Sequence, residues 1–227
     1  MKIRPKLTAV VAASVMAFVP VGLGFAAAPA AADGGCSLLI PSKVRISTPY
    51  KAVTGRLGSN CASAGAIDAS WNLYHPTQGW TDNLSFYPST SETWHVYDWD
   101  VTPAVYTWYP SYAYDSDYDD IAQNRPKTDV RVGSGASIYT SRSGSYVTIK
   151  TSSSRYAHSL SQWVRWGGTR GTIQYYGPAG WTNMKYAYPN SSGYYTYRFY
   201  APKARSYRVV FPSVSSIWGS TSGWSYR

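Results

Sequence analysis

Asp98 and Asp100 form the pair of carboxylates best spaced for catalysis, with Glu92 nearby in the sequence. Paired carboxylates act as acid and as base or nucleophile in glycoside hydrolysis. Side chains two positions apart on a strand leave on the same face, so we expect Asp98 and Asp100 to lie together. The competing interpretation is a solvated strand face. It is favoured because Arg198 occupies the place of Asp98 in a later repeat, and no pattern predicts a cleft.

An acidic segment, Asp115-Ser-Asp117-Tyr-Asp119-Asp120, has carboxylates at its first, third and fifth positions. Loops with this spacing wrap oxygen ligands around Ca²⁺. The segment departs from an EF-hand loop, because Asp120 stands where glycine is needed and Pro126 replaces the twelfth-position glutamate. Two interpretations stay open: a calcium site formed by Asp115, Asp117 and Asp119, or an ordinary solvated loop that holds no cofactor.

The sequence lacks the motifs of the common enzyme classes. It has no G-x-S-x-G elbow, no H-E-x-x-H helix, no P-loop and no dinucleotide-binding glycine run. Its three histidines, His75, His95 and His158, lie far apart. We expect His75 to serve a hairpin turn and His95 to face the core or its edge. A triad assembled in three dimensions stays open, although no residues indicate one, and we expect a protein that is not an enzyme.

Four basic residues lie close together near the end of the chain, with tyrosines between them: Arg198, Lys203, Arg205 and Arg208. Residues 33–126 contain 10 acidic and 5 basic residues, whereas residues 127–227 contain 1 acidic and 13 basic residues. Basic patches with interleaved aromatic residues bind polyanions, including nucleic acid. For an exported protein, anionic wall polymers or acidic polysaccharides fit better than nucleic acid. We expect these four residues to bind such a ligand.

The N-terminus has the three parts of a secretory signal peptide. Basic residues at Lys2, Arg4 and Lys6 precede an apolar run, and three alanines end at Ala32. We expect cleavage after Ala32 and an extracellular, secreted protein with no membrane span after cleavage. An uncleaved membrane anchor is the competing interpretation, which is disfavoured because Pro20 and two glycines interrupt the apolar run.

Two cysteines, Cys36 and Cys61, are the only cysteines of the chain. In an exported protein they are expected to form one disulfide, which stabilises the fold by roughly 3 kcal/mol. They form no C-x-x-C pair and no metal-ligand spacing, so a redox or metal role is not indicated.

Short alternating segments separated by Gly, Pro, Asn and Ser recur along the chain, and long helical patterns are absent. One hairpin surrounds Pro76 and another surrounds Pro178, each followed by Trp-Thr. Matching residues are offset by 102 for Pro76 and Pro178 and by 99 for Pro103 and Pro202. This repeat predicts an all-β fold with two tandem immunoglobulin-like β-sandwich domains: 33–126, acidic with one disulfide, and 127–227, basic.

Several motifs of the second half also resemble a known group of proteins. They are Ser141–Thr148, Gly180-Trp181, Gly193-Tyr194, Tyr207-Arg208 and Ile217–Thr221. They look like the immunoglobulin-like repeats of secreted actinobacterial proteins of unknown function. The resemblance implies a β-sandwich fold and secretion, and it supplies no catalytic residues.

These patterns together favour an exported non-catalytic binding module that contacts cell-envelope polymers or polysaccharide through its basic, aromatic-rich second domain. Two other functions stay open. One is a structural or protein-interaction module that self-associates through its oppositely charged domains. The other is a carbohydrate-active hydrolase that uses Asp98 and Asp100.

Overall fold

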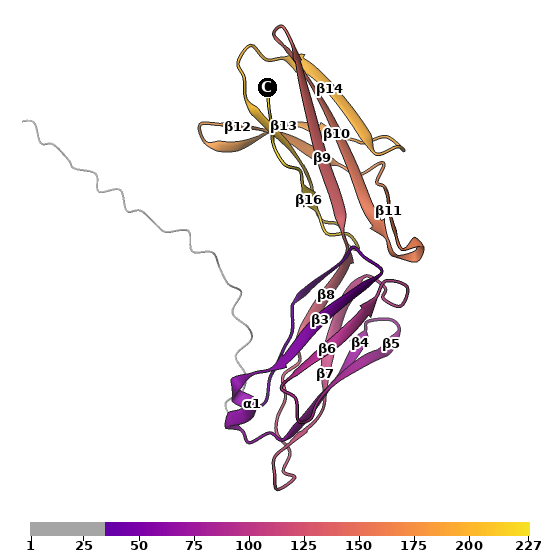
Figure 1. The fold of residues 1–227 in the computed structure, drawn as a ribbon, viewed down its shortest axis with the longest axis vertical. Coiled ribbons are helices and arrows are strands. Elements are labelled where there is room, and N and C mark those ends of the chain that lie inside the picture. Colours follow the sequence, from indigo (N-terminus) through magenta and orange to yellow (C-terminus); the bar gives the residue numbers. More distant parts are fainter. Residues whose placement is uncertain (1–34) are drawn as a thin grey trace, which may run out of the picture. The chain divides into compact units, whose positions relative to one another are not determined.

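The computed structural model describes residues 35–227, and strands are the main secondary structure of these residues (Figure 1). The predicted signal peptide, 1–32, lies outside the described residues. Four sheets occur in the described part, and they form two β-sandwiches in sequence order. The all-β prediction with two sandwiches is therefore confirmed. Within residues 35–227 no helix is long and apolar enough to cross a membrane.

The first sandwich combines a three-stranded and a five-stranded sheet. The smaller sheet has the order β1 (Leu38–Leu39), β3 (Tyr50–Leu57), β6 (Ser91–Tyr97). The larger sheet has the order β2 (Lys43–Ile46), β8 (Lys127–Val132), β7 (Ala104–Tyr114), β4 (Asp68–His75), β5 (Gly79–Phe86). A short helix, α1 (Ser59–Ser63), follows β3. Two facing sheets, between which the chain passes several times, are typical of an immunoglobulin-like sandwich.

Strand β8 belongs to the first sandwich. It runs parallel to β2, with Val44 opposite Val130, and antiparallel to β7, with Tyr106 opposite Thr128. The predicted boundary at 126 assigns this strand to the second domain, whereas all its sheet partners lie in the first. Its alternation of buried Thr128, Val130 and Val132 with more exposed residues suits a strand that covers one side of a core.

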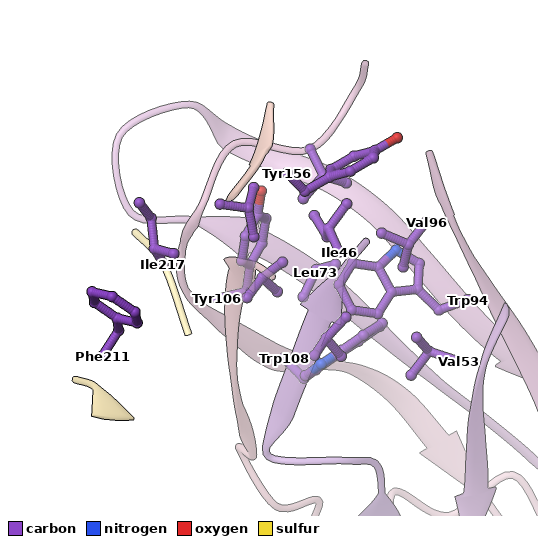
Figure 2. Packing of buried hydrophobic residues seen from close by; sticks show 14 of the residues in the cluster. Ile46, Val53, Leu73, Trp94, Val96, Tyr106, Trp108, Tyr156, Phe211 and Ile217 are labelled. Carbon is purple, nitrogen blue, oxygen red and sulfur yellow. The ribbon is translucent and has the colours of Figure 1, made fainter. Parts of the chain in front are cut away.

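The core of the first sandwich is built around tryptophans. On β6, Trp94 and Val96 are buried while their neighbours His95 and Tyr97 are exposed, which is the alternation of a strand with one face on a core. Figure 2 shows Trp94 beside Trp108 of the opposite sheet; their ring centroids are 5.5 Å apart in an edge-to-face arrangement. Such a pair adds about 1 kcal/mol to the effect of burial alone.

The second sandwich repeats the two-sheet pattern. One sheet contains β9 (Ser134–Ser143), β10 (Tyr146–Ala157), β11 (Gln162–Arg165) and β14 (Tyr194–Tyr200). The other contains β12 (Gly171–Gly177), β13 (Gly180–Ala187), β15 (Ser206–Phe211), β16 (Ser220–Thr221) and β17 (Ser225–Tyr226). A single 3-10 turn, His158–Leu160, joins β10 to β11. Val147 and Ile149 of the first sheet, and Tyr207, Val209 and Phe211 of the second, are buried.

The two hairpins that marked the repeat both have a glycine with positive φ at the turn. The turn between β4 and β5 is closed by Gly79 with φ 82°, and the turn between β12 and β13 is closed by Gly180 with φ 92°. Each hairpin also contains one register shift, after Leu73, two residues before the end of β4, and after Ile173, four residues before the end of β12. Only glycine adopts such positive φ values at little cost, so the predicted hairpins are confirmed together with their cause.

The predicted disulfide between Cys36 and Cys61 is present. It joins the segment before β1 to helix α1, which directly follows β3, and both cysteines are buried. The bridge therefore fixes the entry of the chain to the end of the strand beside which β1 lies.

Candidate functional site

Asp98 and Asp100 do not share a strand face. Strand β6 ends at Tyr97, and residues 98–100 form a turn in which the N–H groups of Asp100 and Val101 both reach the Tyr97 carbonyl. Asp98 is fully buried, whereas Asp100 is exposed. The prediction that both carboxylates lie together on a strand is therefore wrong. The hydrolase alternative loses the geometry on which it rested.

The buried carboxylate of Asp98 is held by a tyrosine. The Tyr156 hydroxyl donates to Asp98 Oδ2 at 2.5 Å, while Asp98 Oδ1 has no hydrogen-bond partner within residues 35–227. Burial, together with this hydrogen bond, raises the pKa of Tyr156 to about 12. The Tyr156 hydroxyl therefore stays protonated at neutral pH and can donate to Asp98. This hydrogen bond gives the buried Asp98 carboxylate a structural role.

The acidic segment forms a loop organised by its own first carboxylate. Asp115 Oδ1 accepts the backbone N–H groups of Asp117 at 2.9 Å and of Asp119 at 3.0 Å. Side chains of Asp117, Asp119 and Asp120 are exposed. Across 35–227 no cluster of three or more His, Cys, Asp or Glu side chains is arranged to hold a metal ion. A calcium site at Asp115, Asp117 and Asp119 stays a prediction.

The three histidines make separate contacts, and His158 Nδ1 lies 3.2 Å from the backbone carbonyl of Asp98. His75 ends β4, and its Nδ1 accepts the N–H groups of Thr77 at 3.2 Å and Gln78 at 3.1 Å, which confirms its predicted turn role. His95 differs from its predicted position facing the core or its edge, because it lies on the exposed face of β6 and contacts the Tyr50 hydroxyl.

The four predicted basic ligand-binding residues lie on β14, β15 and the loop between them. Arg198, Arg205 and Arg208 each lie over an aromatic ring, at 4.8, 4.6 and 4.3 Å from the ring centroids. Lys203 and Arg205 line one cavity, of which Arg198 and Arg208 are not lining residues. The structure thus brings two of the four together at a concave site.

Further cations of the second sandwich stack in the same way. Arg165 lies over Tyr194, Arg170 over Tyr186 and Lys185 over Tyr197. Sequence reasoning did not identify these three, although the frequent alternation of Arg or Lys with Tyr was a signal. Pairing them required the strand register, which only the structure gives.

The cations of the second sandwich have no carboxylate partners. Residues 134–227 contain 11 Lys and Arg residues and no Asp or Glu. Within the described chain the one ion pair joins Arg131 to Asp129 at 2.6 Å, both on β8. The positive charges of the second sandwich are therefore not neutralised by side chains of the described protein.

A cavity of about 460 Å³ lies between the two sheets of the second sandwich. Among its lining residues are Tyr175 of β12, Phe199 and Tyr200 of β14, Lys203 and Arg205 of the β14–β15 loop, and Tyr207 of β15. Its volume is within the range of small-ligand sites. The cavity combines aromatic walls with a basic rim.

Tyr207 is the buried polar group of this cavity. Its side chain is 1% exposed, and its hydroxyl has no hydrogen-bond partner within residues 35–227. Burial raises the pKa of Tyr207, while Arg142 and Arg205 act in the opposite direction. An unpartnered buried hydroxyl costs free energy, so its presence at a cavity wall is notable.

Aromatic side chains also form an exposed row on the first sandwich. The ring of Tyr97 lies 5.3 Å from that of Tyr50 and 5.4 Å from that of Trp99. All three side chains are exposed. Aromatic faces of this kind can stack on sugar rings, which offer an apolar face.

Comparison with known proteins gives no family for this chain, since no family model and no curated protein matches it. Among solved structures, it is similar to the human OSCAR ligand-binding domain, at 14% identity and a TM-score of 0.30, covering 85% of this chain and 98% of that one. It is also similar to the D0-D1 domain of intimin, at 10% identity and a TM-score of 0.26, covering 84% and 96%.

A third similar structure is the BSP domain of a biofilm-associated protein, at 8% identity and a TM-score of 0.29. The alignment covers 84% of this chain and 28% of that one, so this chain spans well under half of that protein's length. TM-scores this low carry no argument about ligand or partner. The sheet order of the chain itself defines its fold, and the resemblance to actinobacterial repeats stays a prediction.

Proposed function

We propose that this protein is an exported, non-catalytic binding module whose second sandwich holds an anionic cell-envelope polymer or acidic polysaccharide. One observation carries the proposal: residues 134–227 contain 11 cationic side chains and no carboxylate. A surface with one sign of charge attracts polymers of the opposite sign and raises their rate of association.

The stacked geometry of the cations suits such a ligand. A guanidinium that lies flat on an aromatic ring keeps its N–H edges free, so it can still donate in the plane to a carboxylate or phosphate. Stacking also restricts the long side chain before the ligand arrives, which lowers the entropy lost on binding. Arg198 over Tyr146 and Arg205 over Tyr175 illustrate this arrangement.

Two features support export. The disulfide between Cys36 and Cys61 belongs to proteins of oxidising compartments, which suggests an extracellular domain. The N-terminal sequence of residues 1–32 has the pattern of a cleaved signal peptide. An extracellular protein with a cationic surface meets wall polymers and polysaccharides before it meets nucleic acid.

The proposal predicts salt-dependent binding to purified cell wall or acidic polysaccharide, measured by co-sedimentation of the mature protein. Changing Arg198, Arg205 and Arg208 together to Gln is expected to weaken binding at low salt by at least about tenfold, because three charge-assisted contacts are lost. High salt is expected to abolish the difference between variant and wild type.

The matched control changes three cations of the first sandwich, Lys51, Arg56 and Arg125, to Gln. Arg125 also stacks on a tyrosine, Tyr109, with 5.5 Å between guanidinium and ring centroid. This variant loses the same charge and is expected to bind almost as wild type. Equal losses in both triple variants, or no binding at low salt, would overturn the proposal.

Self-association is a second candidate, favoured by the exposed acidic side chains of Asp117, Asp119 and Asp120 on the first sandwich. These carboxylates form no ion pair within residues 35–227 and could meet the unpaired cations of a second copy. Light scattering at low salt tests this: salt-sensitive oligomers support it, and a monomer at every salt concentration contradicts it.

A further inference from the structure

The second sandwich departs from the first at one corner, where a buried tyrosine lies near the start of β7 in one sandwich and of β15 in the other. In the first sandwich, the Tyr106 hydroxyl donates to the Thr102 carbonyl at 2.8 Å. This is the tyrosine-corner contact of immunoglobulin-like domains. Tyr207 holds the matching place 101 residues later, yet its hydroxyl has no partner in the described protein.

In the second sandwich, the carbonyl that matches the acceptor of Tyr106 accepts a hydrogen bond from an arginine. Thr102 precedes Pro103, and the matching residue before Pro202 is Ala201. The Ala201 carbonyl accepts Arg142 Nη1 at 2.6 Å instead, and the Lys203 carbonyl accepts Arg142 Nη2 at 3.2 Å. The Tyr207 hydroxyl makes no hydrogen bond to either carbonyl.

The corner loop of the second sandwich is also longer. Two residues separate Pro103 from Tyr106, whereas four separate Pro202 from Tyr207. The lengthened loop contains Lys203 and Arg205, and both line the 460 Å³ cavity together with Tyr207. The longer loop thus brings two exposed cations to the cavity that Tyr207 also lines.

Three further lining residues are aromatic, and Met184, Ala201 and Pro202 complete the lining. Tyr175, Phe199 and Tyr200 line it, and Arg205 lies over the Tyr175 ring at 4.6 Å from the centroid. Flat aromatic walls match the apolar face of a sugar ring, while a small inorganic anion would leave them unused. The cations at the rim of the cavity would attract a negatively charged group on the sugar ring.

We infer that this cavity is a subsite for one carboxylated sugar residue, a uronic acid unit of the polyanion. The inference rests on the proposed function and names the chemistry of its ligand. The sugar ring packs on the aromatic walls, Arg205 and Lys203 hold the carboxylate, and the Tyr207 hydroxyl donates the hydrogen bond for which the protein supplies no acceptor.

The test measures binding of glucuronic acid, glucose and inorganic phosphate to the mature protein by NMR titration. Glucuronic acid is expected to shift resonances of cavity residues and to bind about tenfold more tightly than either glucose or phosphate, since each lacks one of the two recognised features. Equal affinity for glucuronic acid and glucose, or for glucuronic acid and phosphate, overturns the inference.

Three variants locate the site. Arg205→Gln and Tyr207→Phe are each expected to weaken glucuronic acid binding about tenfold, because a hydrogen bond to a charged group is lost. Arg125→Gln serves as the control, since Arg125 is an exposed cation stacked on Tyr109 of the first sandwich and does not line the cavity. If Arg125→Gln weakens glucuronic acid binding as much as Arg205→Gln does, the cavity is not the site.

The two proposals fail differently. Salt-dependent polymer binding without glucuronic acid binding would overturn the subsite and leave the proposed function standing. Glucuronic acid binding without polymer binding would confirm the subsite and contradict a polymer-binding surface. Melting temperature identifies variants that fail to fold, and Tyr207→Phe is expected to melt no lower than wild type because it removes an unpartnered group.

Discussion

Tyr106 and Tyr207 hold matching places in the two repeats but make different contacts. Tyr106 donates to a backbone carbonyl, whereas the Tyr207 hydroxyl is buried at a cavity without a partner in the described chain. A structural tyrosine contributes its hydrogen bond to stability. A tyrosine that binds a ligand leaves its hydroxyl unpaired in the free protein, which lowers the stability of the fold, as groups at functional sites often do.

This difference predicts opposite effects of the same substitution. Tyr106→Phe is expected to lower the free energy of unfolding by about 1 kcal/mol, because one net hydrogen bond is lost. Tyr207→Phe is expected to leave it unchanged or to raise it slightly. Urea denaturation of both variants measures the two values, and equal losses would show that the Tyr207 hydroxyl has a structural partner.

The buried tyrosines also predict how stability depends on pH. Burial is the main cause that raises the pKa values of Tyr106 and Tyr156 to about 12, above a value near 10 in the unfolded chain. Their contribution is therefore complete below about pH 10 and is lost as the pH rises toward 12. Denaturation at stepped pH, followed with phenolate absorbance, checks this; stability that stays constant through that window would contradict it.

At the scale of elements, the hairpins depend on single glycines. Gly180 has φ 92°, and a methyl group added there would meet no heavy atom within 4 Å, so substitution strains the backbone without a steric clash. Gly180→Ala is expected to lower the free energy of unfolding by about 1 kcal/mol. Gly223→Ala is the matched control, since Gly223 is open but lacks the positive φ. Similar losses in both variants, measured by thermal melts, would contradict this explanation.

Sequence reasoning predicted those elements whose cause is local. Proline and glycine at fixed spacing identified the hairpins, and alternation identified β6 up to Tyr97. The same alternation failed at Asp98, because backbone hydrogen bonds to the Tyr97 carbonyl turn the chain there. Tyr156, the hydrogen-bond partner of the Asp98 carboxylate, lies 58 residues further along the chain, so the burial of Asp98 against it was not predictable from local spacing.

Only the part of the candidate site that has a local signal in the sequence was predictable. Clustered charge in the sequence identified Lys203 and Arg205. The cavity requires two strands from different sheets, and the contact of Arg142 with the Ala201 carbonyl joins residues 59 positions apart. The segment between Pro202 and Tyr207 is two residues longer than the segment between Pro103 and Tyr106, and the offsets between the repeats already showed this difference. Its consequence, an unpartnered hydroxyl, became clear only from the structure.

At the scale of the whole molecule, the charge is divided more sharply than the sequence boundary at 126 suggested. Strand β8 contains Asp129 and lies in the first sandwich, so the second sandwich, 134–227, has no acidic residue. The described chain therefore contains two similar folds with different surfaces. The first has exposed carboxylates and a row of aromatic rings, and the second has unpaired cations stacked on rings.

The most direct test of this division compares binding of the mature protein to an acidic polysaccharide and to the same polymer after chemical reduction of its carboxylates. Chain length and sugar rings are then matched, and only the negative charge differs. We predict salt-sensitive binding to the acidic polymer and a loss of at least about tenfold for the reduced form. Equal binding to both polymers at low salt would contradict recognition of the anionic group by the second sandwich.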